Sequence, residues 1–203
     1  DALDAVDALL VAGASPHAAN RYGITPIALA AENGSAPIVQ VLLAAGVDPN
    51  TATSEGESVL MVAARTGRVG VIDQLLEAGA DVERAEGWRG QTALMWAAAE
   101  GHAQVIPAML SHGADVTARS DKGWTALLFA VREGQIDVVQ TLLEAGGDVE
   151  ETLPVEAETR RGGTSAERAA TGLNAFLLAA ANAHYELAAL LIDRGADVNV
   201  ASR

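Results

Sequence analysis

Apolar residues in this chain recur in pairs of short segments at helical spacing, and about ten polar, turn-forming residues follow each pair. For the first segment of each pair, this spacing predicts a helix; these first helices lie near residues 26–33, 59–66, 93–100, 126–133 and 175–182. For the second segment of each pair it also predicts a helix; these second helices lie near residues 36–45, 69–78, 103–112, 136–145 and 185–194. The chain begins with the second helix of a pair, and the first helix of that pair is absent. The apolar face of this helix consists of Leu3, Val6, Leu9 and Leu10. We therefore expect an almost entirely helical protein.

Helix-start and helix-stop residues fall at matching places in the pairs. Each first helix follows a residue whose side chain can accept a hydrogen bond from the first turn, namely Thr25, Ser58, Thr92, Thr125 and Asn174. Four first helices stop at a glycine that can adopt the left-handed conformation, namely Gly34, Gly67, Gly101 and Gly134. Pro26 occupies a first helical position, where its missing N–H costs nothing. Pro107 lies deeper in its helix, so we expect an irregular start there.

The triplet Gly-Ala-Asp, or a close variant, recurs at the end of the second helices. The triplets begin at Gly46, Gly79, Gly113, Gly146 and Gly195. The intervals between them are 33, 34, 33 and 49 residues, and the cap residues keep the same period. A fixed period of this length is the signature of stacked repeats. We expect a single repeat domain over residues 1–203, with a partial repeat at 1–19 and repeats at about 20–52, 53–86, 87–119, 120–151 and 169–203.

Three short stretches identify the repeat. Thr25–Ala31 reads Thr-Pro-Ile-Ala-Leu-Ala-Ala, Gly101 precedes His102, and Gly195–Asn199 reads Gly-Ala-Asp-Val-Asn. These stretches resemble the ankyrin patterns T-P-L-H-x-A-A, G-H and G-A-D-V-N, and the resemblance covers the chain except residues 152–170. It implies an all-α solenoid of antiparallel helix pairs, with turns that project as fingers and a concave binding face.

The chain departs from the ankyrin pattern at two kinds of position. The family's histidine after T-P-L is replaced by Ala28, Met61, Met95, Leu128 and Leu177. We therefore expect apolar contacts between neighbouring repeats in place of the polar link that this histidine makes. In the last repeat Asn174 and Ala183 replace Thr and Gly, so we expect weaker helix caps there.

The last interval, 49 residues against 33, leaves 16 extra residues, which we place at about 152–168. This segment is acidic at first, continues with Arg160 and Arg161, and lacks apolar periodicity after Val155. We interpret it as an exposed loop from the finger at that junction, either without a role or as an extension of the binding face. Thr164–Glu167 fits a capping box, so an extra turn or an early start of the last first helix stays open.

Charge and composition narrow the classes of partner. The net charge of −14 opposes binding to phosphates and anionic membranes, which argues against a nucleic-acid partner. No apolar run approaches the roughly 18 residues of a membrane span, so we expect no membrane insertion. The chain has no cysteine, so the redox compartment stays open. The acidic opening is not a signal peptide, which leaves the cytoplasm, or the periplasm if an upstream signal peptide has been removed.

Catalytic and metal-binding patterns do not emerge. The four histidines are scattered, and His102 and His184 occupy the structural G-H position of the resemblance. The Asp of each Gly-Ala-Asp triplet recurs with the repeat, which indicates a turn-forming role. The glycines fall at helix ends and fingers, and none forms a phosphate-binding loop after a strand. We expect no enzyme activity, no cofactor and no metal.

Large or charged side chains at positions that the repeat leaves open are the candidates for partner binding. They are Tyr22, Trp88, Arg89, Lys122 and Trp124 on or beside the fingers, and Arg65, Arg132, Trp96 and Phe129 on the first helices. Tyr, Trp and Arg are enriched in interface hot spots. The alternatives are that the aromatic rings shield neighbouring backbone, that Trp96 and Phe129 pack between helices, and that the charges are a solvated face.

The sequence therefore predicts a scaffold that binds another protein through its concave face and finger tips. The alternative is a regulatory or accessory segment of a longer enzyme or of a multi-subunit complex, and a third possibility is a structural spacer. Neither end of the chain presents a clear polar cap, so we expect it to be a piece of a longer array. The partner's identity and the oligomeric state stay open. The excess of Arg over Lys, with abundant Ala and Gly, is typical of a GC-rich bacterial genome.

Overall fold

The computed structural model describes residues 2–153 and 172–199 of the chain. Within these residues the secondary structure is helical apart from isolated bridges in the turns, which confirms the predicted all-α class. The first helices are α2 (Pro26–Glu32), α4 (Val59–Arg65), α6 (Ala93–Ala99), α8 (Ala126–Glu133) and α11 (Ala175–Ala181). The second helices are α1 (Ala2–Val11), α3 (Ala36–Ala44), α5 (Val69–Glu77), α7 (Ile106–Ser111), α9 (Ile136–Glu144) and α12 (Tyr185–Asp193).

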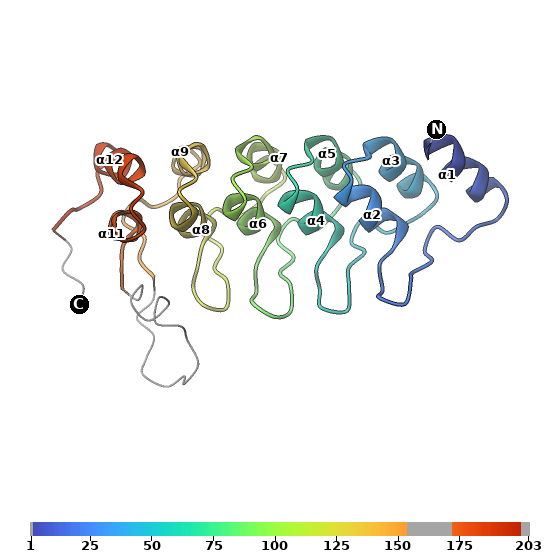
Figure 1. Cartoon of the computed structure of the whole chain (residues 1–203), viewed down its shortest axis with the longest axis horizontal. Helices are drawn as coiled ribbons and strands as arrows, with labels where there is room; N and C mark the ends of the chain where they lie inside the picture. The colour runs from blue at the N-terminus through green and yellow to red at the C-terminus, as the bar shows by residue number, and fades with distance from the viewer. Residues whose placement is uncertain (1, 154–171, 200–203) are drawn as a thin grey trace.

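The helices stack in two parallel rows to form an elongated solenoid (Figure 1). In the figure the second helices form the upper row and the first helices the lower row, with the finger turns projecting below the first helices. Each helix pair packs against the pairs before and after it, and α1 packs on α3 at one end of the rows. The buried side chains form one cluster that runs through the stack. Such an array has a core along its length instead of a single centre.

Side chains cap the helix starts as the sequence predicts, except at Thr92, whose side chain accepts no cap hydrogen bond. The side chains of Thr25, Ser58, Thr125 and Asn174 each accept a hydrogen bond from the backbone N–H three residues later. The Asn174 bond, at 2.9 Å, shows that Asn174 caps α11, and the lower strength expected for the caps of this repeat stays a prediction. Asn174 Nδ2 also donates to the carbonyl oxygen of Asp197, which ties the cap to the turn after α12.

The start of α7 is irregular, as expected at Pro107. Residues Ala103–Val105 form a 3₁₀ turn, and the α-helix begins only at Ile106. Proline lacks the N–H that a regular helix would use at this place, so the preceding turn tightens instead.

The five repeating aspartates shape the turns after the second helices. Each carboxylate accepts a hydrogen bond from the backbone N–H two residues later, over distances of 2.8 to 3.0 Å, in Asp48, Asp81, Asp115, Asp148 and Asp197. This local bond mimics a backbone turn and confirms the predicted structural role.

The positions of the missing family histidine are apolar and buried in the central repeats. Met61, Met95 and Leu128 are almost fully enclosed, which agrees with the expectation of apolar contacts. Polar links between repeats are nevertheless present at the histidines that start the second-helix segments. His102 Nε2 lies 3.0 Å from the carbonyl oxygen of Arg65, and His184 Nε2 lies 3.0 Å from that of Arg132. A carbonyl oxygen only accepts, so both rings donate here, and both histidines have the structural role that the sequence suggests.

The bases of the fingers close in the same way in all repeats. In the second finger (residues 53–57) Thr53 donates its N–H to the carbonyl oxygen of Glu57 at 3.0 Å. In the last finger Leu153 donates to Leu173 at 3.0 Å, and Thr152 bridges to Asn174. Thr152 and Leu153 therefore belong to the finger, and the extra residues begin after Leu153 instead of at 152. Residues 154–171 lie outside the described part, so the loop expected there stays a prediction.

Candidate binding surface

One residue of each finger holds the backbone of the tip with a side-chain oxygen. These residues are Asn20, Thr53, Glu86 and Ser120, in the first (20–24), second (53–57), third (86–91) and fourth (120–124) fingers. Asn20 Oδ1, for example, accepts from the N–H groups of Tyr22 and Ile24 at 2.9 and 3.0 Å. These bonds fix the conformation of the finger backbone, and none of them involves the large side chains of the fingers.

The third finger is organised by a buried carboxylate. The residue Glu86 is only 2% exposed, and its oxygens accept from the backbone N–H groups of Trp88 at 2.7 Å, Arg89 at 3.0 Å and Gln91 at 3.1 Å. A buried charge requires such compensation. The consequence is a fixed turn that carries an exposed Trp88 and an exposed Arg89.

Neighbouring fingers are bonded to one another at their tips. Gly87 donates its N–H to the carbonyl oxygen of Glu55 at 2.9 Å, and Asp121 donates to that of Arg89 at 2.9 Å. The second, third and fourth fingers therefore form one continuous surface. Lys122 lies exposed at the tip of the fourth finger, next to the Asp121 bond.

Arginine side chains stack on aromatic rings at three places on the fingers and first helices. The guanidinium carbon of Arg89 lies 4.6 Å from the ring centroid of Trp88, and that of Arg21 lies 4.6 Å from Tyr22. The guanidinium carbon of Arg132 lies 5.0 Å from Trp124. Cation–π stacking at these distances fixes the orientation of both groups.

Trp124, Phe129 and Arg132 form one cluster on the fourth repeat. Trp124 comes from the base of the finger, and its ring lies 5.3 Å from that of Phe129 on α8. Arg132 covers both rings and is paired with Glu133 at 2.6 Å. Phe129 is only 5% exposed, so it packs beneath the surface and positions the other two side chains. The fold therefore brings these three predicted residues together.

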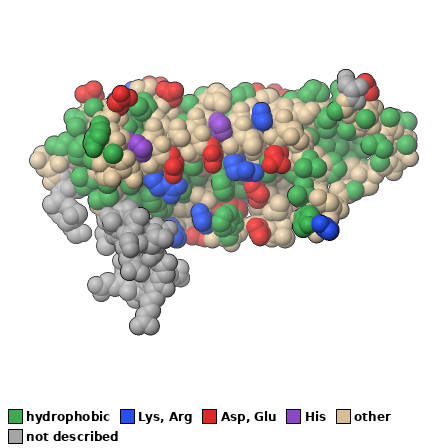
Figure 2. Space-filling view, in the orientation of Figure 1, with side chains coloured by type: hydrophobic (Ala, Val, Ile, Leu, Met, Phe, Trp, Pro, Cys, Tyr) green, Lys and Arg blue, Asp and Glu red, His purple; other side chains and the backbone are tan. Residues whose placement is uncertain are grey.

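The remaining predicted residues lie apart from that cluster. Tyr22 is exposed on the first finger. Arg65 on α4 pairs with Glu57 of its own finger at 3.7 Å. Arg65 occupies the repeat position of Arg132, and Glu57 occupies that of Trp124. Trp96 on α6 is half-buried and occupies the repeat position of Phe129. Figure 2 shows Lys and Arg side chains mainly over the first helices and fingers, interspersed with acidic ones.

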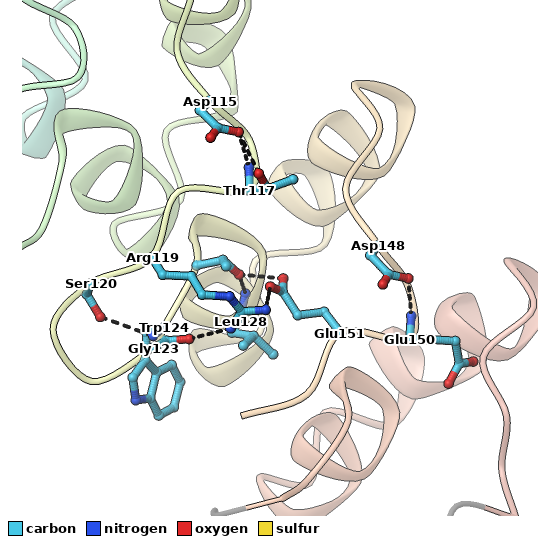
Figure 3. A network of polar contacts seen from close by, with 11 residues as sticks. Asp115, Thr117, Arg119, Ser120, Gly123, Trp124, Leu128, Asp148, Glu150 and Glu151 are labelled. Carbon is cyan, nitrogen blue, oxygen red and sulfur yellow. Dashed lines mark hydrogen bonds and ion pairs between the residues drawn. The ribbon is translucent and has the colours of Figure 1, made fainter. Parts of the chain in front are cut away.

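Glu151 is a polar residue of the repeat junction that sequence reasoning missed (Figure 3). One oxygen accepts from the Thr125 hydroxyl at 2.6 Å, and the other lies 2.7 Å from the Arg119 guanidinium, which also donates to the carbonyl oxygen of Gly123. Burial raises the pKa of Glu151, while the Thr125 hydrogen bond and the Arg119 charge oppose that shift. The only sequence signal is an acid where other repeats have Thr51, Arg84 and Ala118.

The described residues show neither a metal-binding cluster nor a membrane-spanning helix. No group of three or more His, Cys, Asp or Glu side chains within residues 2–153 and 172–199 is arranged to hold a metal ion. None of the helices described is both long and apolar enough to cross a lipid bilayer.

Fold and surface together define a helical repeat solenoid with rigid, bonded fingers. A family model described as ankyrin repeats (3 copies) matches residues 1–86 and 83–152, and a single ankyrin repeat model matches residues 171–203. The chain therefore belongs to the ankyrin repeat family. Ankyrin repeats are generally protein–protein interaction modules and are typically not enzymes. A comparison with curated proteins finds no match.

Proposed function

We propose that this protein is a non-enzymatic scaffold that binds a protein partner through its fingers and first helices. The observation that carries the proposal is the third finger, whose buried Glu86 fixes a tip with an exposed Trp88 and Arg89. Rigid exposed Trp and Arg side chains are typical of interface hot spots, because little conformational entropy is lost on binding.

The proposed contact surface extends from this tip to the fourth repeat. It includes Lys122, Trp124 and Arg132, while Phe129 supports the last two from beneath. Trp96 lies on α6, one repeat before Phe129, and Arg65 and Tyr22 belong to the earlier repeats. The inter-finger bonds support this choice, since a partner would meet a preformed surface.

A comparison of matched surface variants tests the proposal. Trp88→Ala with Arg89→Glu changes the proposed surface, whereas Tyr185→Ala with Arg194→Glu changes exposed side chains on α12 and just after it. In a pull-down from the native cells, we expect the first pair to release a specifically bound protein and the second pair to retain it. Equal retention by both pairs would exclude the finger surface as the binding site.

A further inference from the structure

Both residues that flank Trp124 are held by one buried carboxylate, that of Glu151 (Figure 3). Glu151 Oε2 accepts a hydrogen bond from the hydroxyl of Thr125 at 2.6 Å. Glu151 Oε1 accepts from the guanidinium of Arg119 at 2.7 Å. The same guanidinium donates to the carbonyl oxygen of Gly123 at 2.8 Å. The polar contacts of Glu151 therefore reach the residue before Trp124 and the residue after it.

The other fingers are built without this pair of charged side chains. The position of Arg119 carries an uncharged residue in the other repeats, in Ala52, Ala85 and Thr152. The position of Glu151 carries no acid in the other repeats, in Thr51, Arg84 and Ala118. A departure from the repeat that is confined to one unit indicates a local role for these side chains.

The fourth finger also lacks a backbone contact that other fingers have. In the second, third and last fingers a β-bridge joins the residue before the finger to the cap residue, in Ala52–Ser58, Ala85–Thr92 and Thr152–Asn174. Within residues 2–153 and 172–199, no such bridge joins Arg119 to Thr125. The side-chain contacts of Glu151 therefore hold the base of the fourth finger where a backbone contact is missing.

The geometry around Glu151 is that of an ionised carboxylate. Each of its two oxygens accepts a hydrogen bond, one from a hydroxyl and one from a cation. A protonated carboxyl group uses one oxygen as a donor and no longer attracts the Arg119 guanidinium as an anion. Both contacts therefore weaken when Glu151 takes up a proton.

Two charged groups face Glu151 within the described residues. Arg119 comes from the segment before the fourth finger, and Asp148 comes from the turn after α9. The start of α8 contributes the uncharged Thr125 hydroxyl, and the fifth repeat contributes the N–H of Ala175, which donates to the backbone carbonyl of Glu151. Burial raises the pKa of Glu151 above the ordinary glutamate value, the Thr125 hydrogen bond and the Arg119 charge oppose this shift, and the Asp148 charge adds to it.

We propose that Glu151 is a positioning residue for Trp124 and makes the surface of the fourth repeat sensitive to acid. The ionised carboxylate holds Thr125 directly and Gly123 through Arg119, so the Trp124 ring keeps its place against its aromatic neighbour on α8. Protonation loosens both contacts, and the ring then loses this fixed place. A partner that contacts Trp124 is released as the pH falls, and this last step alone rests on the proposed protein-binding function.

Fluorine NMR of the full chain labelled with 5-fluorotryptophan tests the proposal without a partner. The chain has three tryptophans, so Trp88→Phe and Trp96→Phe assign the resonance of Trp124. We expect this resonance to shift in one step as the pH falls, with a midpoint above the ordinary glutamate pKa.

Three variants show which carboxylate causes the step. Glu151→Gln removes the charge and keeps the size of the side chain, so its Trp124 resonance should lie near the acid position of the wild type and show no step. Arg119→Gln should reduce the step, because the link from Glu151 to the finger carbonyl is lost. Glu150→Gln is the matched control, since it changes the adjacent exposed carboxylate, and it should keep the full step.

Amide hydrogen exchange provides a second measurement of the same effect. The N–H groups of Gly123 and Trp124 both donate to Ser120 inside the finger. We expect their exchange in Glu151→Gln to be about tenfold faster than in the wild type at neutral pH. Exchange in α4 and α5 should stay within about twofold, which separates a local release from a general loss of stability.

A Trp124 resonance that does not shift with pH, or a step that persists in Glu151→Gln, would overturn the proposal. Loss of the step in Glu150→Gln would overturn it as well. If Glu151→Gln does not fold, the wild type and Arg119→Gln decide, because equal steps in these two proteins contradict the role of Arg119. A partner whose binding ignores the Trp124 step would remove only the acid-release step, and none of the NMR results affects the scaffold function.

Discussion

At the end of α11 the chain passes through a left-handed residue, and that residue is Ala183, with φ of 61°. Gly34, Gly67, Gly101 and Gly134 occupy this place in the other repeats. An alanine there is strained, because its Cβ crowds the backbone at positive φ. Ala183→Gly should therefore raise the free energy of unfolding by about 0.5–1 kcal/mol, as measured by urea denaturation.

Gly134→Ala is the reciprocal control for that prediction. It introduces the same strain at φ of 73°, and the new Cβ would lie 2.7 Å from the ring of His184. We expect a loss of stability larger than the gain from Ala183→Gly. If Ala183→Gly lowers stability instead, the entropy of the unfolded chain outweighs the strain at this position.

Glu151 gives stability at the third-to-fourth repeat junction a distinctive pH dependence. Its pKa is raised in the folded chain, mainly by burial, so the folded state holds the proton to higher pH than the unfolded state. The stabilising contribution of the protonated form is therefore lost as pH rises from the ordinary glutamate value to the folded value. The stability of the wild type minus that of Glu151→Gln should therefore fall as the pH rises above the ordinary glutamate range.

Chemical denaturation at a series of pH values measures this difference in the free energy of unfolding. The contributions of the other carboxylates cancel in the difference, because both proteins contain them. The nearby Asp148 carboxylate raises the pKa of Glu151 in the same direction as burial. A difference that grows with pH would mean that the bonds from Thr125 and Arg119 outweigh burial. In that case the pKa of Glu151 would be lowered instead.

Among the elements, the third finger depends most on a single side chain. Glu86→Ala leaves three backbone N–H groups at a buried site without their acceptor. We expect a loss of about 2–4 kcal/mol in the free energy of unfolding, and faster hydrogen exchange at Trp88, Arg89 and Gln91. Thr53→Ala is the matched variant, since it removes one such bond in the second finger and should cost about 0.5–1.5 kcal/mol. Equal losses would show that solvent replaces the Glu86 bonds.

The helices were predictable because their determinants are local. The cap at Ser58, the stop at Gly134 and the turn at Asp115 each act within a few residues, so the repeat displays them in the sequence. The polar residues Glu86 and Glu151 were not predictable in the same way. Their burial depends on how the fingers pack, and neither occupies a position where the other repeats have an acid. The finger aromatics fall between these cases, since Trp88 stays exposed while Trp124 folds onto Phe129.

At the scale of the whole molecule, the repeats are tied by a ladder of bonds at the ends of the second helices. Asn50 accepts from the N–H of Asp81, Glu83 from Asp115 and Glu150 from Asp197, over 2.5 to 2.8 Å. At the third-to-fourth junction Thr117 donates instead to Asp115 of its own repeat. Across that junction Glu151 bonds to Arg119 and Thr125 instead, in addition to the packing of the helices.

The last prediction concerns the extra residues between the fourth and fifth repeats. The bonds between Leu153, Gly172 and Leu173 repeat those between Thr53, Gly56 and Glu57. Residues 154–171 can therefore be replaced by Ser-Glu, the tip sequence of the second finger.

The graft shortens the loop by 16 residues. Because closure entropy grows with the logarithm of loop length, it should stabilise the last repeat by roughly 1–2 kcal/mol. Urea denaturation followed through hydrogen exchange in α11 and α12 measures this gain, with the wild type as reference. If α11 and α12 lose protection in the graft, the replaced segment contributes packing to the last repeat, and the interpretation of it as a loop is wrong.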